Sequence, residues 1–337
     1  MALSPVHAPS KLPVLVRAAF DRARASGDLN FYPTLVAVLR VNAIPFQLRF
    51  CPSLAHKPQH PRSSDSDATT TTTTTTTTNP FLHPSPALLI APLPPSHTLL
   101  LNRFAIVPHH FLLITSTFHP QTDLLTPADL AAALAVQAAY EDQTAGGELF
   151  VFFNSGAHSG ASQPHRHLQL LPVASMRAGL DEPDGGGWDV LAATLLDGAQ
   201  AGGAAVRPGL PFATFAAPVA RRVGAEEAHA LYLGLYRRAC EAVGVRGAAG
   251  QEAGEARISY NLALARGAMV LCPRLAEGAA VVGEGGEEVG LLALNGTVLA
   301  GTALVKSQKE WDALTADPEQ LGRILGKIGL PAAGVDS

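Results

Sequence analysis

Residues 150–173 read FVFFNSGAHSGASQPHRHLQLLPV: a short apolar run, a loop rich in Gly and Ser, and a second run in which polar and apolar residues alternate. In the second run His165, His167 and Gln169 occupy every second position, and Arg166, Leu168 and Leu170 occupy the alternate positions. Successive side chains of a β-strand point to opposite faces of a sheet. We therefore predict a strand that presents two imidazoles and an amide on one face and its leucines to a core.

The residue types in this stretch favour nucleophilic chemistry on an anionic substrate. Imidazole has an ordinary pKa of about 6.5, so the ring is mostly unprotonated at neutral pH and can attack a carbonyl or phosphorus centre. Backbone N–H groups and hydroxyls of the preceding loop can surround anionic oxygens. Gln169 is neutral and cannot act as a general acid. The pattern therefore suits a leaving group that needs no proton, such as a phosphate anion.

Two other interpretations of the histidines are open on the residues alone. Histidines two positions apart on a strand can bind a metal ion, and His158 is a candidate third ligand. Between Gly146 and Arg177, however, Glu148 is the only Cys, Asp or Glu. Single histidines also often have no function. The combination with Gln169 and the Gly/Ser loop favours a functional site, and we predict no metal ligands.

The motif SGASQPHRHLQLLP, with NSG before it, resembles the active-site strand of the histidine-triad superfamily, in the branch with the H-x-H-x-Q pattern. This branch holds the galactose-1-phosphate uridylyltransferases and the fungal-type ATP adenylyltransferases, also called diadenosine tetraphosphate phosphorylases. Pro164 departs from the adenylyltransferase pattern, which has an acidic residue there, and is similar to the His-Pro-His of the uridylyltransferases. Five further segments resemble the adenylyltransferases, so that the resemblance spans nearly the whole chain: 44–58, 99–115, 120–130, 259–274 and 292–331.

The resemblance implies a nucleotidyltransferase that phosphorolyses diadenosine tetraphosphate (Ap4A) to ATP and ADP, reversibly, through an adenylyl-histidine. It implies that His167 is the nucleophile, that His165 orients it through its backbone carbonyl, and that Gln169 hydrogen-bonds the phosphate. The substrate-binding residues that follow from it are Lys57, Asn102, Arg103, Asn154, Gly160, Ala161, Ser162, Gln163, Asn295, Gly296, Thr297 and Lys306. Two alternatives stay open: a uridylyltransferase-like sugar-nucleotide transferase, and a non-catalytic nucleotide-binding protein.

The expected ligands are adenine dinucleotide polyphosphates, ATP, ADP and phosphate, with Mg²⁺ on the polyphosphate and no tightly bound cofactor. The formal net charge of −4 argues against a nucleic-acid-binding protein, so local Lys and Arg must meet the anionic substrate. Three scattered Cys, and no signal-peptide layout or long apolar run, predict a soluble cytoplasmic protein without membrane contact. The nucleus is a further expected location, and we expect a monomer.

Hairpin patterns outnumber helical ones, which predicts an α+β fold. We expect a histidine-triad-like, mostly antiparallel sheet flanked by helices, with an elaborated C-terminal part. Helices are predicted at 11–27, 126–142 and 225–243 and from Asp317-Pro318 to Gly329. Strand patterns are predicted at 46–50, hairpins at 98–115 and 259–274, and a turn at Asn295-Gly296.

The chain is predicted to form one compact unit with two parts. Residues 1–175 form the N-terminal catalytic part, and residues 176–337 form the C-terminal part that completes the nucleotide site. Residues 62–79 include ten consecutive Thr, from Thr69 to Thr78. A homopolymer cannot define a core face, so we predict a disordered insertion here.

Overall fold

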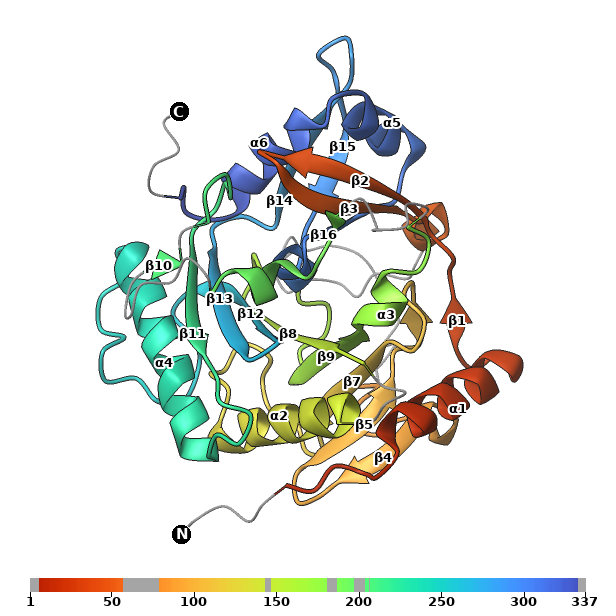
Figure 1. Ribbon diagram of the computed structural model, residues 1–337, viewed down its shortest axis with the longest axis vertical. Coiled ribbons are helices and arrows are strands. Elements are labelled where there is room, and N and C mark those ends of the chain that lie inside the picture. The colour runs from red at the N-terminus through yellow and green to blue at the C-terminus, as the bar shows by residue number, and fades with distance from the viewer. Residues whose placement is uncertain are drawn as a thin grey trace, which may run out of the picture.

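The computed structural model describes residues 6–56, 79–142, 147–180, 187–196, 204–205 and 207–332. A nine-stranded sheet forms its centre, in the order β10-β11-β13-β12-β8-β9-β7-β5-β4, and every neighbouring pair is antiparallel (Figure 1). The strands are β4 (Leu89–Leu93), β5 (His97–Leu101), β7 (Phe111–Thr115), β8 (Leu149–Ser155), β9 (His167–Pro172), β10 (Ala204–Ala205), β11 (Thr214–Pro218), β12 (Ser259–Ala265) and β13 (Ala268–Arg274). The predicted α+β fold with a mostly antiparallel sheet is confirmed. The division of the chain into two parts at residue 175 stays a prediction. Strands β8 and β12, one from each predicted part, pair directly in this sheet.

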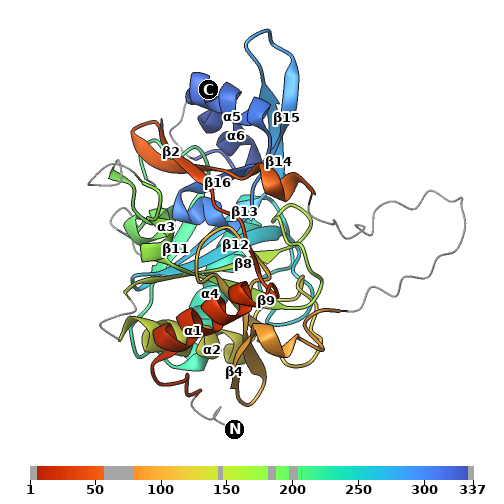
Figure 2. The same ribbon diagram turned by 90° about the vertical axis from the view of Figure 1, so that its right-hand side faces the viewer.

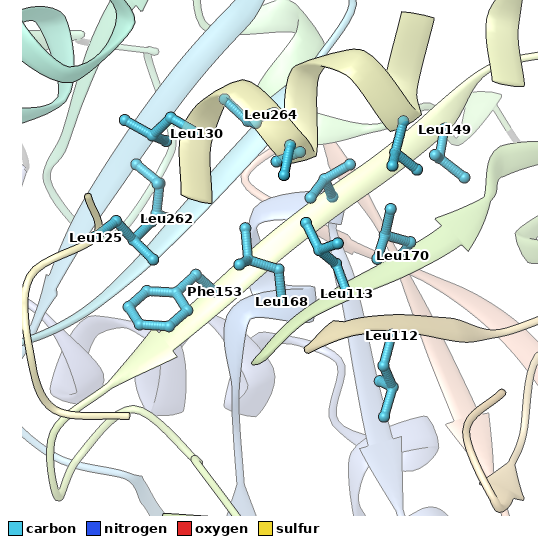
Figure 3. Packing of buried hydrophobic residues seen from close by; sticks show 14 of the residues in the cluster. Leu112, Leu113, Leu125, Leu130, Leu149, Phe153, Leu168, Leu170, Leu262 and Leu264 are labelled. Atoms are coloured by element: carbon cyan, nitrogen blue, oxygen red, sulfur yellow. The ribbon is translucent and has the colours of Figure 1, made fainter. Parts of the chain in front are cut away.

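Three helices cover one face of this sheet: α1 (Leu12–Ala25), α2 (Pro127–Glu141) and α4 (Ala225–Ala242) (Figure 1). All three lie within the predicted ranges. Helix α2 begins as predicted, because the Thr126 side chain accepts a hydrogen bond from the Asp129 backbone N–H and the Asp129 carboxylate accepts one from that of Thr126. Leu168 and Leu170 of β9 lie in the core between the sheet and α2, whereas Leu112 points to the other side of β7 (Figure 3).

The opposite face of the large sheet packs against a smaller one, in the order β16-β3-β2, as Figure 2 shows. Strand β3 pairs antiparallel with β2 and parallel with β16. In the second pair Gln47 lies opposite Thr302, more than 250 residues further along the chain. The elements on this side are β2 (Leu35–Val41), β3 (Ile44–Phe50), β16 (Thr302–Val305), the hairpin of β14 (Gly278–Val282) and β15 (Glu288–Ala293), α5 (Gln308–Ala316) and α6 (Glu319–Ile328). Strands of both halves of the chain therefore enclose the second core.

Shorter elements connect these layers. They are the parallel pair β1 (Asn30–Phe31) and β6 (Phe104–Ala105), helix α3 (Val173–Met176), and the 3₁₀ helices η1 (Pro52–His56), η2 (Pro86–Leu88), η4 (Leu191–Thr194) and η5 (Gly296–Ala300). Within the described ranges, no helix is long and apolar enough to cross a membrane.

Two details differ from the sequence-based expectations. The predicted hairpin at 98–115 excludes Phe104, which pairs with β1 instead. Asn295-Gly296 is not a simple turn: Asn295 caps η5 by accepting a hydrogen bond from the backbone N–H of Thr297. The predicted strand at 46–50 lies within β3, where the buried side chains of Gln47 and Arg49 both donate to the backbone carbonyl of Met176 at the end of α3.

Candidate active site

His167 is the first residue of β9, and its side chain is only 4% exposed. Its ring Nδ1 donates a hydrogen bond to the backbone carbonyl of His165 at 2.8 Å. This contact fixes the tautomer and leaves the lone pair on Nε2, for which no hydrogen-bond partner exists among the described residues. Burial lowers the pKa of the ring to about 4. The hydrogen bond to the carbonyl of His165 raises the pKa, but the effect of burial is larger. At neutral pH Nε2 is therefore unprotonated, the state in which an imidazole can act as a nucleophile.

His165 is held by both of its ring nitrogens. Nε2 donates to the backbone carbonyl of Thr115 at 2.8 Å, and the amide of Asn79 donates to Nδ1 at 3.1 Å. The ring of Phe81 packs against both histidines, with centroids 5.7 Å from His165 and 5.2 Å from His167. His165 forms an isolated bridge to Pro120 rather than part of β9, so the predicted strand begins two residues later than the pattern suggests. Both ring nitrogens of His165 are thus engaged, and its backbone carbonyl is the group that contacts His167.

Asn154 of β8 lies beside His167 on the same face of the sheet. Its side-chain Oδ1 accepts hydrogen bonds from Asn261 Nδ2 and from the backbone N–H of Gly296, both at 2.9 Å. These two donors fix the orientation of the amide, so that its Nδ2 is the group available to a substrate. A side chain at Gly296 would approach Asn154 Oδ1 to 2.7 Å, which explains the need for glycine there. The predicted residues Asn154 and Gly296 are thus in direct contact.

The Gly/Ser loop packs on the same region. Gly160 has a φ of +77°, and a side chain there would meet Asn295 Cβ at 2.6 Å. The loop that contains Gly160 therefore lies against the Asn295–Thr297 segment. Among the described residues, the backbone N–H groups of Gly160, Ser162 and Gln163 have no hydrogen-bond partner, which leaves them able to bind anionic oxygens. The N–H of Ala161 donates to Ser159 Oγ at 3.3 Å.

Gln169 is half-buried and lies on β9 between Leu112 of β7 and Phe152 of β8. It shares the His167 face, as the alternation predicts, because it is two residues along the same strand. The structure thus brings eight of the predicted residues into one region around His167: His165, Gln169, Asn154, Gly160, Ser162, Gln163, Asn295 and Gly296.

The predicted cationic residues of the described ranges, Arg103 and Lys306, are both exposed. Asn102 and Arg103 directly follow β5, whose last residue pairs with Phe111 of β7. Phe111 lies three positions along β7 from Ile114, the partner of His167. The amide of Asn102 contacts His110 Nδ1 at 3.0 Å, whereas Arg103 is exposed. Lys306 is exposed at the end of β16. Lys57 and residues 62–78 of the Thr-rich segment lie outside the described residues.

Four residues of the site were not predicted from the sequence. Asn79, which the sequence analysis assigned to the Thr-rich insertion, contacts His165 directly. Gln121 bonds to the backbones of both Asn154 and His167. Arg274, buried, donates to Asn261 Oδ1 at 2.5 Å and to the carbonyl of Leu294, and so ties the Asn154 amide to the Asn295 segment. Asn261 shares its face of β12 with Ala263 and Ala265, and this polar residue at an inward spacing is the one sequence signal that could have indicated part of this set.

An ion-pair network lies behind the histidine strand. Arg166, between the two histidines, donates to Asp129 Oδ2 at 2.9 Å, and His97 Nε2 contacts Asp129 Oδ1 at 2.8 Å. All three side chains are buried. Burial raises the pKa of Asp129, but the hydrogen bond from His97 and the charge of Arg166 outweigh it and hold the pKa at about 2. The network therefore ties the H-R-H segment to the first turn of α2. No group of three His, Cys, Asp or Glu side chains in the described ranges could hold a metal ion.

The chain matches two family models that together cover most of its length. Residues 3–183 match the Ap4A phosphorylase N-terminal domain, and residues 208–331 match the ATP adenylyltransferase C-terminal domain. The chain belongs to the Ap4A phosphorylase family. A relative within the family is diadenosine 5',5'''-P1,P4-tetraphosphate phosphorylase 2 of Saccharomyces cerevisiae, 29% identical over 301 residues, which are 85% of this chain and 84% of the relative.

Solved structures of the yeast Ap4A phosphorylase Apa2 are similar to nearly all of the chain. The complex with Ap4A has a TM-score of 0.74 at 24% identity and covers 96% of this chain and 98% of Apa2. The complex with AMP has a TM-score of 0.71 at 25% identity and covers 97% and 99%. The fold of the Ap4A phosphorylase family thus extends across both matched segments of this protein.

The buried His167 predicts how stability depends on pH. The pKa of His167 is about 4 when folded and about 6.5 when unfolded, so the unfolded chain binds more protons between these values. The contribution of neutral His167 to the free energy of unfolding is therefore fully present above pH 6.5. It is lost as the pH falls to 4, and the total loss is about 3 kcal/mol. Urea unfolding of the wild type and of His167→Asn at several pH values measures this pH dependence. The wild type should lose more unfolding free energy than the variant on acidification, and equal slopes would contradict the assignment.

Proposed function

We propose that this protein is an Ap4A phosphorylase, which cleaves Ap4A with inorganic phosphate to ATP and ADP, reversibly, through an adenylyl-histidine on His167. The observation that carries this proposal is the Nε2 atom of His167, kept unprotonated by burial and by the Nδ1 contact to His165, beside donors suited to a phosphate. Membership of the Ap4A phosphorylase family supports the choice of substrate.

In the first step His167 Nε2 attacks an α-phosphorus of Ap4A. A bond forms between nitrogen and phosphorus, and the bond from that phosphorus to the bridging oxygen breaks, so that ATP leaves. The ring becomes a cation in the intermediate, and its Nδ1–H donates more strongly to the carbonyl of His165. Because ATP leaves as an anion, the leaving group needs no general acid, and a neutral Gln169 in hydrogen-bonding reach of the phosphate is sufficient.

The donors around His167 stabilise the charge that develops on the phosphate. The amide Nδ2 of Asn154 and the backbone N–H groups of Gly160, Ser162 and Gln163 have no described partners and are proposed to hold the α-phosphate oxygens. In the second step a phosphate oxygen attacks the adenylyl-histidine, the bond to nitrogen breaks, and ADP leaves. The starting imidazole is restored.

The rest of the substrate requires positive charge further from His167. We assign this to Lys57, Arg103 and Lys306, with Asn102 and the Asn295–Thr297 segment as further contacts, and with Mg²⁺ carried by the polyphosphate itself. Arg103 and Lys306 are exposed at the ends of β5 and β16. Exposed cations can adapt to a long, flexible polyphosphate. We also propose that the enzyme acts as a monomer in the cytoplasm.

The product pair and the covalent adduct test the proposal. The protein is incubated with Ap4A labelled in adenosine, with and without phosphate, then quenched and digested for mass spectrometry. We expect ATP and ADP in equal amounts only with phosphate, and AMP on the peptide that contains His167. ATP with AMP irrespective of phosphate indicates a hydrolase and contradicts the proposal. UMP on the protein after incubation with UDP-glucose indicates a uridylyltransferase, and tight binding without products indicates a non-catalytic binding protein.

A further inference from the structure

Gln121 lies between the ends of two neighbouring strands and is 3% exposed. Its Oε1 accepts a hydrogen bond from the backbone N–H of His167 at 2.8 Å. Its Nε2 donates to the backbone carbonyls of Asn154 at 2.7 Å and of His167 at 3.2 Å. One side-chain amide therefore satisfies both backbone groups of His167 and one of Asn154.

The pairing of β8 with β9 shows what this amide replaces. The described register ends with Phe152 opposite Gln169. Continuing it by two residues would place Asn154 opposite His167, with their backbones within reach of each other. Instead, both backbones bond to the Gln121 amide. An amide inserted between two strands keeps them apart, so β8 and β9 diverge where their side chains face the substrate.

Gln121 is itself held in place by backbone contacts. Its N–H donates to the carbonyl of Pro164 at 2.8 Å, and the N–H of Arg166 donates to the carbonyl of His119 at 2.8 Å. Residues 119–121 therefore run antiparallel to residues 164–166 around the isolated bridge between Pro120 and His165. The position of the Gln121 amide is thus coupled to the H-R-H segment, and it cannot move without moving the nucleophile.

We propose that Gln121 is a positioning residue that sets the separation between the His167 ring and the Asn154 amide, and so the placement of the α-phosphate between them. This proposal rests on the proposed role of His167 as the nucleophile. Only an amide provides one acceptor and two donors in this geometry. Without it, β8 and β9 can pair directly and carry His167 toward Asn154. A displacement of about 1 Å at a reacting group is enough to cost about 10²-fold in rate.

Gln121→Met tests the proposal against a matched control, Gln137→Met. Gln137 is also a buried glutamine whose Nε2 donates to backbone carbonyls of two neighbouring strands, Leu149 at 2.9 Å and Leu264 at 3.4 Å. It lies at the other end of β8. We expect Gln121→Met to lower kcat for Ap4A phosphorolysis about 10²-fold with KM changed less than about threefold. Gln137→Met should leave both constants within about threefold of the wild type.

The outcomes separate this proposal from that of the function. If the wild type forms no adenylyl-histidine, the proposed function fails, irrespective of Gln121. If the wild type forms the adduct and Gln121→Met forms it as fast as Gln137→Met does, the function stands and the positioning role is wrong. A loss confined to KM would likewise overturn the positioning role, because it would indicate a substrate contact.

Gln121→Glu provides a second readout, which also serves if Gln121→Met does not fold. An ionised carboxylate can accept from His167 N–H but faces two carbonyl oxygens without a donor. Protonation restores one O–H donor, and burial beside carbonyls raises the pKa of such a carboxyl. The ratio of the variant's kcat to that of the wild type should therefore rise about tenfold as the pH falls from about 8 to about 6. A ratio that does not change with pH would overturn the proposal.

Discussion

His167→Gly is expected to lower the rate of Ap4A phosphorolysis by about 10⁴-fold or more, because no described neighbour can replace its Nε2 as the nucleophile. His165 cannot substitute, since its ring nitrogens are engaged by Thr115 and Asn79. The measurement is ATP and ADP formation at saturating Ap4A and phosphate. Exogenous imidazole should restore part of the rate, because it can occupy the space of the missing ring between Phe81 and the sheet.

His158→Gly is the control for this experiment. His158 is exposed in the Gly/Ser loop, and its backbone N–H, which the variant keeps, donates to Ser259 Oγ. Its turnover should stay within about threefold of the wild type. A similar loss of rate in both variants would indicate that the two histidines act together, as the ligands of a metal ion do. An unchanged rate in His167→Gly would remove the nucleophile from the mechanism.

The second large effect is expected in stability. Asp129→Ala should lower the free energy of unfolding by about 3–5 kcal/mol, because it leaves the buried charge of Arg166 without its nearest carboxylate. It also removes the acceptor for His97 and half of the capping box of α2. Urea or guanidinium unfolding at pH 7 measures the loss.

Asp123→Asn is the matched control. Its carboxylate lies 3.8 Å from Arg166 Nη2 and is 26% exposed, so solvent screens the pair. The variant should cost less than about 1 kcal/mol. If Asp129→Ala costs no more than this control, the network behind the histidine strand contributes little, and the position of Arg166 must depend on other contacts.

The local period of the sequence was sufficient to predict the face that carries the chemistry. His167 and Gln169 share one face, and Leu168 and Leu170 enter the core opposite, because an extended strand fixes side-chain direction from residue to residue. The helix that begins at Thr126 was predictable for the same reason, since its cap and first turn are neighbours in sequence.

The contacts that assemble the site were not predictable in this way. Gln121 is 46 positions from His167 in a segment without periodicity, and only the folded chain brings its amide between two strands. Asn79 follows a homopolymer that carries no pattern, and it still reaches His165. Arg274 resembles a surface cation by composition, but β13 carries it into the core beside Asn261. Such residues are specified by tertiary packing rather than by local propensity.

The pairing of distant strands affects how the chain folds as it is made. Residues 47–50 of β3 cannot pair with β16 until residues 302–305 have been synthesised. Likewise, residues 151–155 of β8 cannot pair with β12 until residues 260–264 have been synthesised. Until then, both strands leave backbone N–H and C=O groups without partners, and such edges readily join other chains. We therefore expect the nascent polypeptide to depend on chaperones until nearly all of it has emerged from the ribosome.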